Sequence, residues 1–184
     1  WYQGGISVID FTDSSNPVEI AFFDRGPLNP DRLVMAGYWS AYWYRGFIYG
    51  TEIARGLDVL ELLPSEYLTR NEIAAASLVA PATFNAQQQR RHDWPARPVV
   101  ARVYLDQLGR SDTIAAERHE ALSNLLDRTD QVLANGSRTD AAIAAQLDTA
   151  AAALERDSAG ASGRNQKRLR SLAETLTSLA ERLR

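Results

Sequence analysis

The charged side chains best suited to chemistry follow one another closely between residues 52 and 61. Glu52 and Arg55 flank a short connection between two predicted strands, and Asp58 and Glu61 lie on the second of these strands. Asp58 and Glu61 have opposite strand parity, so they cannot share one face of a regular strand. For Glu52 and Arg55 we consider two hypotheses. Either Arg55 forms a buried pair with a carboxylate and fixes the loop, or Glu52 and Arg55 together build a binding site.

An aromatic segment lies just upstream, where Trp39 and Trp43 alternate with Tyr38, Tyr42 and Tyr44. Exposed aromatic rings stack on sugars or form energetic centres of protein interfaces. Alternate side chains of a strand point to opposite faces, and both faces of an inner strand can be buried. We favour core packing for this segment, and we keep Trp39 and Trp43 as candidate ligand contacts.

Motifs for catalysis and metal binding are missing from the sequence. His92 and His119 are the only histidines, without a His-x-x-x-His pair, and there is no Gly-x-Ser-x-Gly segment. The chain has no cysteine, which excludes thiolate zinc sites and disulfides. Asp10 and Asp13 flank a turn that lacks the spacing of a calcium loop. We predict no catalytic residue, no metal site and no cofactor.

Composition and charge narrow the class of partner. The chain has 184 residues, of which 45% are hydrophobic and 23% charged, with a formal net charge of −3. These values are typical of globular domains. A chain without a basic excess lacks the electrostatic signature of nucleic-acid binding. No apolar run approaches the roughly 18 residues that a transmembrane segment needs. We therefore expect neither nucleic acid nor a membrane span.

Residues 1–63 are predicted to be β-structure that repeats. Short apolar runs, rich in β-branched and aromatic residues, indicate strands at residues 6–11, 18–23, 38–44, 47–51 and 57–62. Arg45–Gly46 predicts a tight hairpin. The segments Gly5–Phe11 and Gly56–Leu62 share the pattern Gly-aliphatic-x-Val-aliphatic-acid-apolar. A repeat of roughly 40–50 residues made of short antiparallel strands is typical of propeller blades. The expected fold is a partial β-propeller, consisting of its last one to two blades.

The remainder of the chain is predicted to be helical. Residues 64–111 form an irregular and helical connector, with a capping box from Thr69 to Glu72 and a helix that begins at Pro98. Residues 112–184 carry three stripes of apolar side chains at spacings of three and four. Short loops between the stripes favour an antiparallel three-helix bundle as a C-terminal domain.

The segment Gly4–Pro17, which reads Gly-Gly-Ile-Ser-Val-Ile-Asp-Phe-Thr-Asp-Ser-Ser-Asn-Pro, resembles the LVIVD repeat family. The resemblance continues through Gly37–Tyr44 and Ala54–Val59, and it implies the C-terminal part of a secreted or cell-surface bacterial β-propeller. Trp1 is the first residue and Met35 the only methionine. We therefore expect the given chain to be a fragment, with N-terminal propeller blades of the same protein among its partners.

The resemblance implies no reaction. The expected function is that of a non-enzymatic extracellular or cell-surface β-propeller, acting as a binding module for a protein or a glycan. The alternative is a propeller enzyme, of hydrolase or lyase type, with a channel site that lies mostly in the missing N-terminal blades. A binding site built from Glu52 and Arg55 would face the channel of such a propeller, whereas a buried Arg55–carboxylate pair that fixes the loop is the interpretation we favour.

Overall fold

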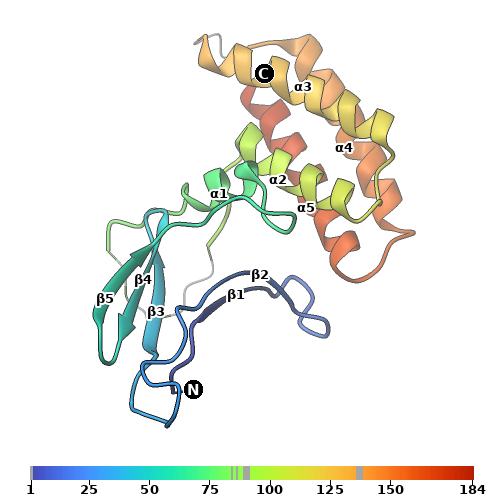
Figure 1. The fold of residues 1–184 in the computed structure, drawn as a ribbon. Coiled ribbons are helices and arrows are strands. Elements are labelled where there is room, and N and C mark those ends of the chain that lie inside the picture. The colour runs from blue at the N-terminus through green and yellow to red at the C-terminus, as the bar shows by residue number, and fades with distance from the viewer. Residues whose placement is uncertain (1, 84, 86, 89–91, 136–138) are drawn as a thin grey trace. The chain divides into compact units, whose positions relative to one another are not determined.

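The computed structural model describes residues 2–83, 85, 87–88, 92–135 and 139–184. The chain divides into two compact units, residues 1–93 and residues 94–184. We call the first the β unit, because it contains all the described strands, and the second the helical unit (Figure 1). Each unit is described by itself below.

The described part of the β unit contains two small antiparallel sheets. Strands β1 (Ile6–Asp10) and β2 (Val18–Phe23) form a two-stranded sheet. Strands β3 (Tyr38–Tyr44), β4 (Phe47–Glu52) and β5 (Gly56–Leu60) form a three-stranded sheet in the order β3-β4-β5. The two groups are drawn as separate ribbons in Figure 1. These short segments are rich in β-branched and aromatic residues, which favour strands.

The connection between β3 and β4 is the tight hairpin that the sequence predicts. Arg45 and Gly46 both have positive φ angles, 48° and 89°. A two-residue turn of this kind matches the right-handed twist of the strands that it joins. Tyr44 therefore pairs with Phe47, and the register of the sheet is set from this end.

The expected β-propeller fold is wrong. Propeller blades are four-stranded sheets stacked around a channel, whereas the described strands form sheets of two and three strands that are neither closed nor curled. The two segments of the sequence repeat do form strands β1 and β5, but β1 pairs with β2 and β5 pairs with β4. A shared local pattern made similar strands without making stacked blades. The hypothesis of a channel-facing site built from Glu52 and Arg55 therefore loses the channel on which it depended.

A β-bulge in β3 changes the face on which its first residue lies. Tyr38 pairs with Glu52 and Ser40 pairs with Thr51, which leaves Trp39 as the extra residue. Beyond the bulge, Trp43 pairs with Ile48, so it shares a face with the even-numbered residues of β4. A bulge shifts side-chain parity by one position. Tyr38 therefore lies on the face of Trp43, which we call the inner face.

In its described residues the helical unit has four helices, where the sequence predicted a bundle of three. They are α2 (Pro98–Arg110), α3 (Ala116–Ala134), α4 (Ala141–Ser158) and α5 (Gly163–Arg182). Helix α2 belongs to the bundle because Ala101, Leu105 and Leu108 are part of its buried core. The predicted stripes supply the rest of that core through the leucines of α3, α4 and α5. None of the helices in the described residues is long and apolar enough to cross a membrane.

The remaining helix, α1 (Arg70–Ala76), lies in the β unit. It begins at the predicted capping box, in which Thr69 Oγ1 accepts from the Glu72 amide at 3.2 Å and Glu72 Oε2 accepts from the Thr69 amide at 2.6 Å. Two orphan amides at the helix start are thereby satisfied. The capping box is confirmed.

Candidate binding surface

Glu52 at the end of β4 organises the loop before β5. Its side chain is buried, and its Oε1 accepts a 2.7 Å hydrogen bond from the Gly37 amide. Its Oε2 accepts from the amides of Ala54, at 2.8 Å, and Arg55. These backbone donors, that of Gly37 foremost, lower the pKa of Glu52. The carboxylate is therefore held ionised at neutral pH and occupied by the protein's own backbone.

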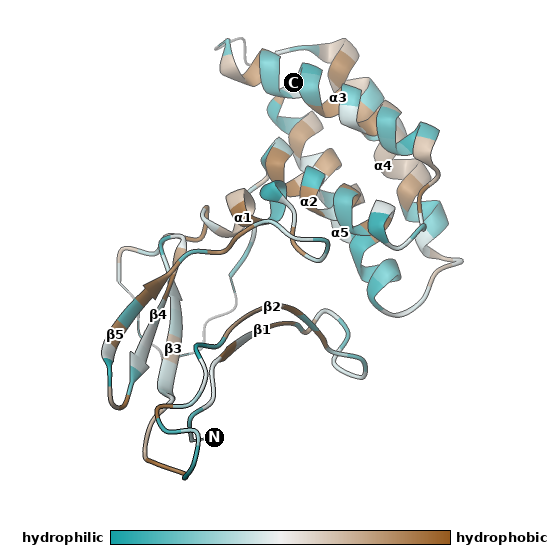
Figure 2. Cartoon of the chain, viewed as in Figure 1, coloured by the Kyte–Doolittle hydropathy of each residue, from teal (hydrophilic) through white to brown (hydrophobic). Residues whose placement is uncertain are grey.

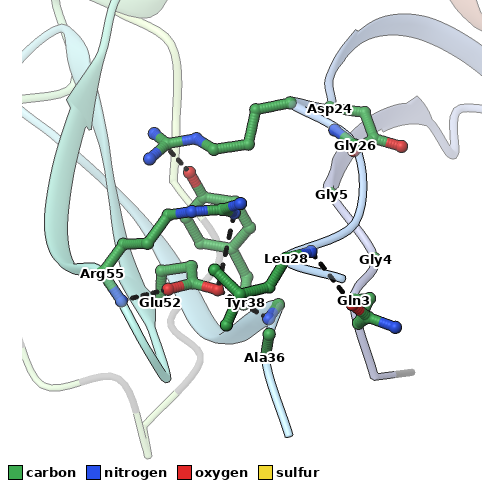
Figure 3. A pocket seen from close by; sticks show the side chains of 12 residues that line it. Gln3, Gly4, Gly5, Asp24, Gly26, Leu28, Ala36, Tyr38, Glu52 and Arg55 are labelled. Atoms are coloured by element: carbon green, nitrogen blue, oxygen red, sulfur yellow. Dashed lines mark hydrogen bonds and ion pairs between the residues drawn. The ribbon is translucent and has the colours of Figure 1, made fainter. Parts of the chain in front are cut away.

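Arg55 contributes less to this arrangement. Its Nη1 lies 3.9 Å from Glu52 Oε1, which is long for a hydrogen-bonded ion pair. The Arg55 amide, rather than its guanidinium group, makes the close contact with Glu52. The loop is thus fixed mainly by the carboxylate and the backbone, and Figure 3 shows the guanidinium group joined to Glu52 by the longer ion-pair contact.

Tyr38, Asp58 and Arg25 form a second polar group on the inner face. The Tyr38 hydroxyl donates to Asp58 Oδ2 at 2.5 Å, and Arg25 Nη2 lies 2.7 Å from Asp58 Oδ1. Donation from Tyr38 and from Arg25 lowers the pKa of Asp58. Burial and the hydrogen bond to Asp58 raise the pKa of Tyr38 to about 12. Tyr38 is therefore a proton donor, not a phenolate, throughout the physiological range.

The same residues join the two sheets of the β unit. Arg25 follows the end of β2, and its guanidinium carbon lies 5.2 Å from the centre of the Phe23 ring. Phe23 in turn contacts Tyr38 edge-on, with ring centres 6.2 Å apart. We call Phe23, Arg25, Tyr38, Glu52, Arg55 and Asp58 the sheet junction. Its charges connect β2 to β3, β4 and β5, which is a structural role.

Gly50 allows Tyr38 to reach Asp58 across the central strand. A Cβ atom at position 50 would lie 2.6 Å from Tyr38 Cε1 and 2.9 Å from Ile6 Cδ1. Gly50 pairs with Asp58 in the register of β4 and β5. Because Gly50 has no side chain, the Tyr38 ring can cross β4 at this position and extend from one edge strand to the other.

The hollow at the sheet junction is too small to hold a substrate, and its polar side chains already make hydrogen bonds within the protein. Its free volume is about 10 Å³, whereas small-molecule sites take roughly 300–1,000 Å³. Figure 3 shows Tyr38, Glu52 and Arg55 gathered here with Gln3 and Leu28 beside them. The Gln3 side chain is itself used, because its Oε1 accepts from the amides of Leu28 and Asn29. Among the described residues there is no cluster of metal-ligating side chains.

The opposite side of the three-stranded sheet is exposed. Pairing places one row of Tyr42, Tyr49 and Val59 beside a second row of Ser40, Thr51 and Leu57. We call this side the open face; it also includes the hairpin pair of Tyr44 and Phe47, and none of its members is buried.

The two candidate tryptophans differ in position. Trp39, in the bulge, is 75% exposed, whereas Trp43 is half-buried on the inner face. The structure therefore places these two tryptophans apart. Neither shares the role of Glu52, whose carboxylate accepts hydrogen bonds from the backbone amides of Gly37 and Ala54. The alternation in the sequence could not show this, because a bulge leaves no mark in a run of aromatic residues. Gly50 inside an aromatic strand is the only sequence signal of the close approach.

Exposed apolar residues are distributed unequally between the two units. Among the described residues, every exposed large hydrophobic side chain except Trp94 lies in the β unit. Figure 2 shows brown, hydrophobic stretches along β1, β2 and β5. Leu57 and Val59 on the open face are 63% and 53% exposed. Contiguous exposed apolar surface of this kind marks interaction sites.

Comparisons with protein-family models, with curated proteins and with solved structures find no match for this chain. What the chain does has to be inferred from its own residues.

Proposed function

We propose that this chain is a non-enzymatic interaction module that binds a protein partner through the open face of β3, β4 and β5. The observation that carries the proposal is the contrast between the two sides of one sheet. The inner face is completed by Ile6, Tyr38 and Asp58, whereas the open face presents aromatic and aliphatic side chains to solvent. Rigid, partly exposed tyrosines are enriched at protein interfaces.

A protein fits the open face better than a glycan does. Sugar recognition combines a stacking ring with polar side chains that bond the hydroxyl groups. The two rows of the open face carry no carboxylate, amide or guanidinium group, and the hydroxyls of Ser40 and Thr51 bond each other at 2.7 Å. The Arg45 guanidinium lies at the hairpin end of this face, with its carbon 5.3 Å from the centre of the Tyr44 ring. Leu57 and Val59 add aliphatic surface, which favours an apolar partner surface.

The absence of catalysis in this proposal follows from the state of the polar groups. The carboxylates of Glu52 and Asp58 are ionised and already bonded by protein donors, and Tyr38 holds its proton. A general base or nucleophile needs a free lone pair directed at a substrate. The setting at the cell surface or outside the cell belongs to the same proposal, and the resemblance of residues 4–17 supports it. Fractionation of the cells that make the protein would test it.

The experiment uses a phage-displayed library of decapeptides selected against the full chain, with affinities then measured by fluorescence anisotropy. Tyr49→Ser in the middle of the open face is expected to weaken the selected peptides at least about tenfold, as expected for an aromatic centre of an interface. Phe22→Ser, at an exposed aromatic position outside the open face, is the matched control and should leave affinity unchanged.

Two outcomes would overturn the proposal. One is a selection that yields no peptide sensitive to Tyr49→Ser. The other is binding of soluble oligosaccharides, tested with chitotetraose and cellotetraose, by a chain that binds no peptide. Far-UV circular dichroism of each variant verifies that the fold is retained.

A further inference from the structure

We propose that Arg45, at the hairpin end of the open face, binds an acidic side chain of the protein partner. This inference rests on the proposed function and specifies the chemistry of the partner. Arg45 is exposed, and with Gly46 it forms the turn between β3 and β4. The proposal rests on the charge of Arg45, on its contact with Tyr44 and on the conformation of its backbone.

The charge of Arg45 is not balanced within the described part of the chain. At the sheet junction, Arg25 Nη2 lies 2.7 Å from Asp58 Oδ1. Arg55 Nη1 lies 3.9 Å from a carboxylate oxygen. Arg45 forms no such ion pair with a described residue, and the two rows of the open face carry no carboxylate. Because a guanidinium group forms its strongest hydrogen bonds with carboxylates, charge complementarity specifies an acidic group on the partner surface that covers the hairpin end.

The Tyr44 ring orients the guanidinium group of Arg45. The guanidinium carbon lies over this ring, 5.3 Å from its centre. An arginine that stacks on an aromatic ring still has its N–H donors at the edge of its plane, where a carboxylate can accept two of them. The side chain is partly ordered before a partner arrives, and this ordering lowers the entropy cost of forming the ion pair.

The same contact connects the cation to the centre of the open face. Tyr44 pairs with Phe47, and Tyr42 pairs with Tyr49 two residues further from the turn. The ring centres of Tyr44 and Tyr49 are 6.4 Å apart. Two residues of a strand span about 6.8 Å, so a partner that covers Tyr49 reaches Arg45 with a short segment. The partner surface therefore combines an apolar contact over Tyr49 with an acidic side chain next to it, on the side of the turn.

The backbone of Arg45 has a conformation that does not favour arginine. Its φ angle is 48°, in the left-handed region, and Gly46 follows with a φ angle of 89°. Asn-Gly is the favoured sequence for a two-residue turn of this kind, because asparagine tolerates the left-handed region better than most residues do. Local strain of this kind is found at binding sites more than elsewhere. The hairpin thus keeps an arginine where asparagine would stabilise it, which is consistent with a role in recognition.

The test uses the decapeptides selected against the full chain, synthesised with an amidated C-terminus so that only side-chain carboxylates remain. The selected peptides should contain more aspartate and glutamate than the unselected library. Replacement of the selected acid by its amide, asparagine or glutamine, should weaken binding in fluorescence anisotropy at least about tenfold, as for the loss of one partner of an interfacial charge pair. The difference between acid and amide peptides should decrease at high salt.

Arg45→Asn separates recognition from folding. In this variant the acid and amide peptides should bind with equal affinity, because the cation is gone. The midpoint of thermal unfolding should rise, because Asn-Gly suits the turn. Arg45→Lys keeps the charge without the planar donors and should retain part of the difference between the two peptides. Arg32→Asn, at an exposed position outside the open face, is the matched control and should leave that difference unchanged.

Four results would overturn the inference. Selected peptides without an excess of acids, but sensitive to Tyr49→Ser, would leave the open face as the binding site and remove the acidic contact. A difference between acid and amide peptides that persists in Arg45→Asn would assign the acid to another cation. A lower midpoint of thermal unfolding in Arg45→Asn would make Arg45 a structural residue of the hairpin. Concentration-dependent dimers in light scattering that Arg45→Asn abolishes would assign the cation to a second copy. Failure to select any peptide would contradict the proposed function together with this inference.

Discussion

The side chains of Tyr38 and Asp58 form a hydrogen bond across β4, the strand that lies between their own strands. The Tyr38 hydroxyl, on edge strand β3, donates at 2.5 Å to Asp58 on the opposite edge strand β5, and the ring passes over Gly50 of β4. One hydrogen bond therefore fastens the two outer strands of the sheet together. Arg25 at the end of β2 extends the same connection to the second sheet.

Removal of the Tyr38 hydroxyl should weaken the β unit. Tyr38→Phe leaves Asp58 with Arg25 but without its closest donor, and we expect a loss of about 1 kcal/mol, as for a partly exposed hydrogen bond to a charged group. The pKa of Asp58 should rise towards its ordinary value, which NMR titration of the carboxyl carbon can measure. Tyr49→Phe, on the open face, is the control, and an equal loss in that variant would argue against the bond.

Gly50→Ala should disrupt the crossing of Tyr38. The new methyl group would meet the Tyr38 ring and Ile6 at distances below normal contact, and overpacking of this kind costs about 1–3 kcal/mol. Chemical denaturation followed by tyrosine and tryptophan fluorescence measures the change. Gly160→Ala provides the comparison, because a methyl group there comes no closer than 3.7 Å to its neighbours. If both variants were equally stable, the proposed passage would be wrong.

The β unit should lose stability in acid. The pKa values of Asp58 and Glu52 are lowered in the folded chain, so their contribution is complete above the unfolded pKa values and disappears as the pH falls through the folded ones. The loss should begin near pH 4, where unfolded carboxyl groups titrate. Hydrogen exchange of the β-unit amides, measured between about pH 3 and pH 6 and corrected for intrinsic exchange rates, would detect this loss of stability. In Glu52→Gln the acid dependence should be smaller, and an unchanged slope would contradict the assignment.

Alkaline pH should act through Tyr38. Its pKa is raised to about 12, so its contribution is present below the unfolded value and is lost as the pH rises from about 10 through about 12. Tyrosinate absorbance near 295 nm, compared between the unmodified chain and Tyr38→Phe, should show one late-titrating group. A difference spectrum that titrates with the other tyrosines would contradict this prediction.

Core truncation in the helical unit should leave the β unit intact. Leu176 is fully buried in α5, and Leu176→Ala is expected to cost about 2–5 kcal/mol through the lost apolar contacts and the cavity. Thr177→Ala, at the exposed neighbouring position, should be nearly neutral. Amide exchange in the full chain should accelerate in α2–α5 and stay unchanged in β3–β5. Acceleration in both units would show that they unfold together.

Local elements were predictable from the sequence, and their assembly was not. The strands at 18–23 and 38–44, the Arg45–Gly46 turn and the capping box at Thr69 lie where the residues indicate. Turn residues, caps and apolar spacing act over a few positions, so they are visible in a short stretch. Which strands pair depends on contacts distant in sequence, and the repeat at Gly5 and Gly56 suggested a propeller that the strand pairing contradicts.

The candidate site illustrates the same division. Glu52 and Arg55 were predicted to lie in a loop; the structure places Arg55 there, whereas Glu52 is the last residue of β4 and its carboxylate bonds the loop amides. The role of Tyr38 could not be predicted, because strict alternation groups it with Tyr42 and the bulge at Trp39 moves it to the other face. Helix α2 was likewise separated from the bundle, since its apolar stripe does not show against which helices it packs.

The absence of a side chain at Gly50 also restricts how this sequence can vary among species. Any mutation that adds a side chain at position 50 becomes tolerable only after position 38 has lost its long ring, and without that ring Asp58 keeps a charge that Arg25 alone must balance. Positions 38, 50 and 58 should therefore change in concert across orthologues, so that an alignment of related sequences would display the crossing as a correlated triplet.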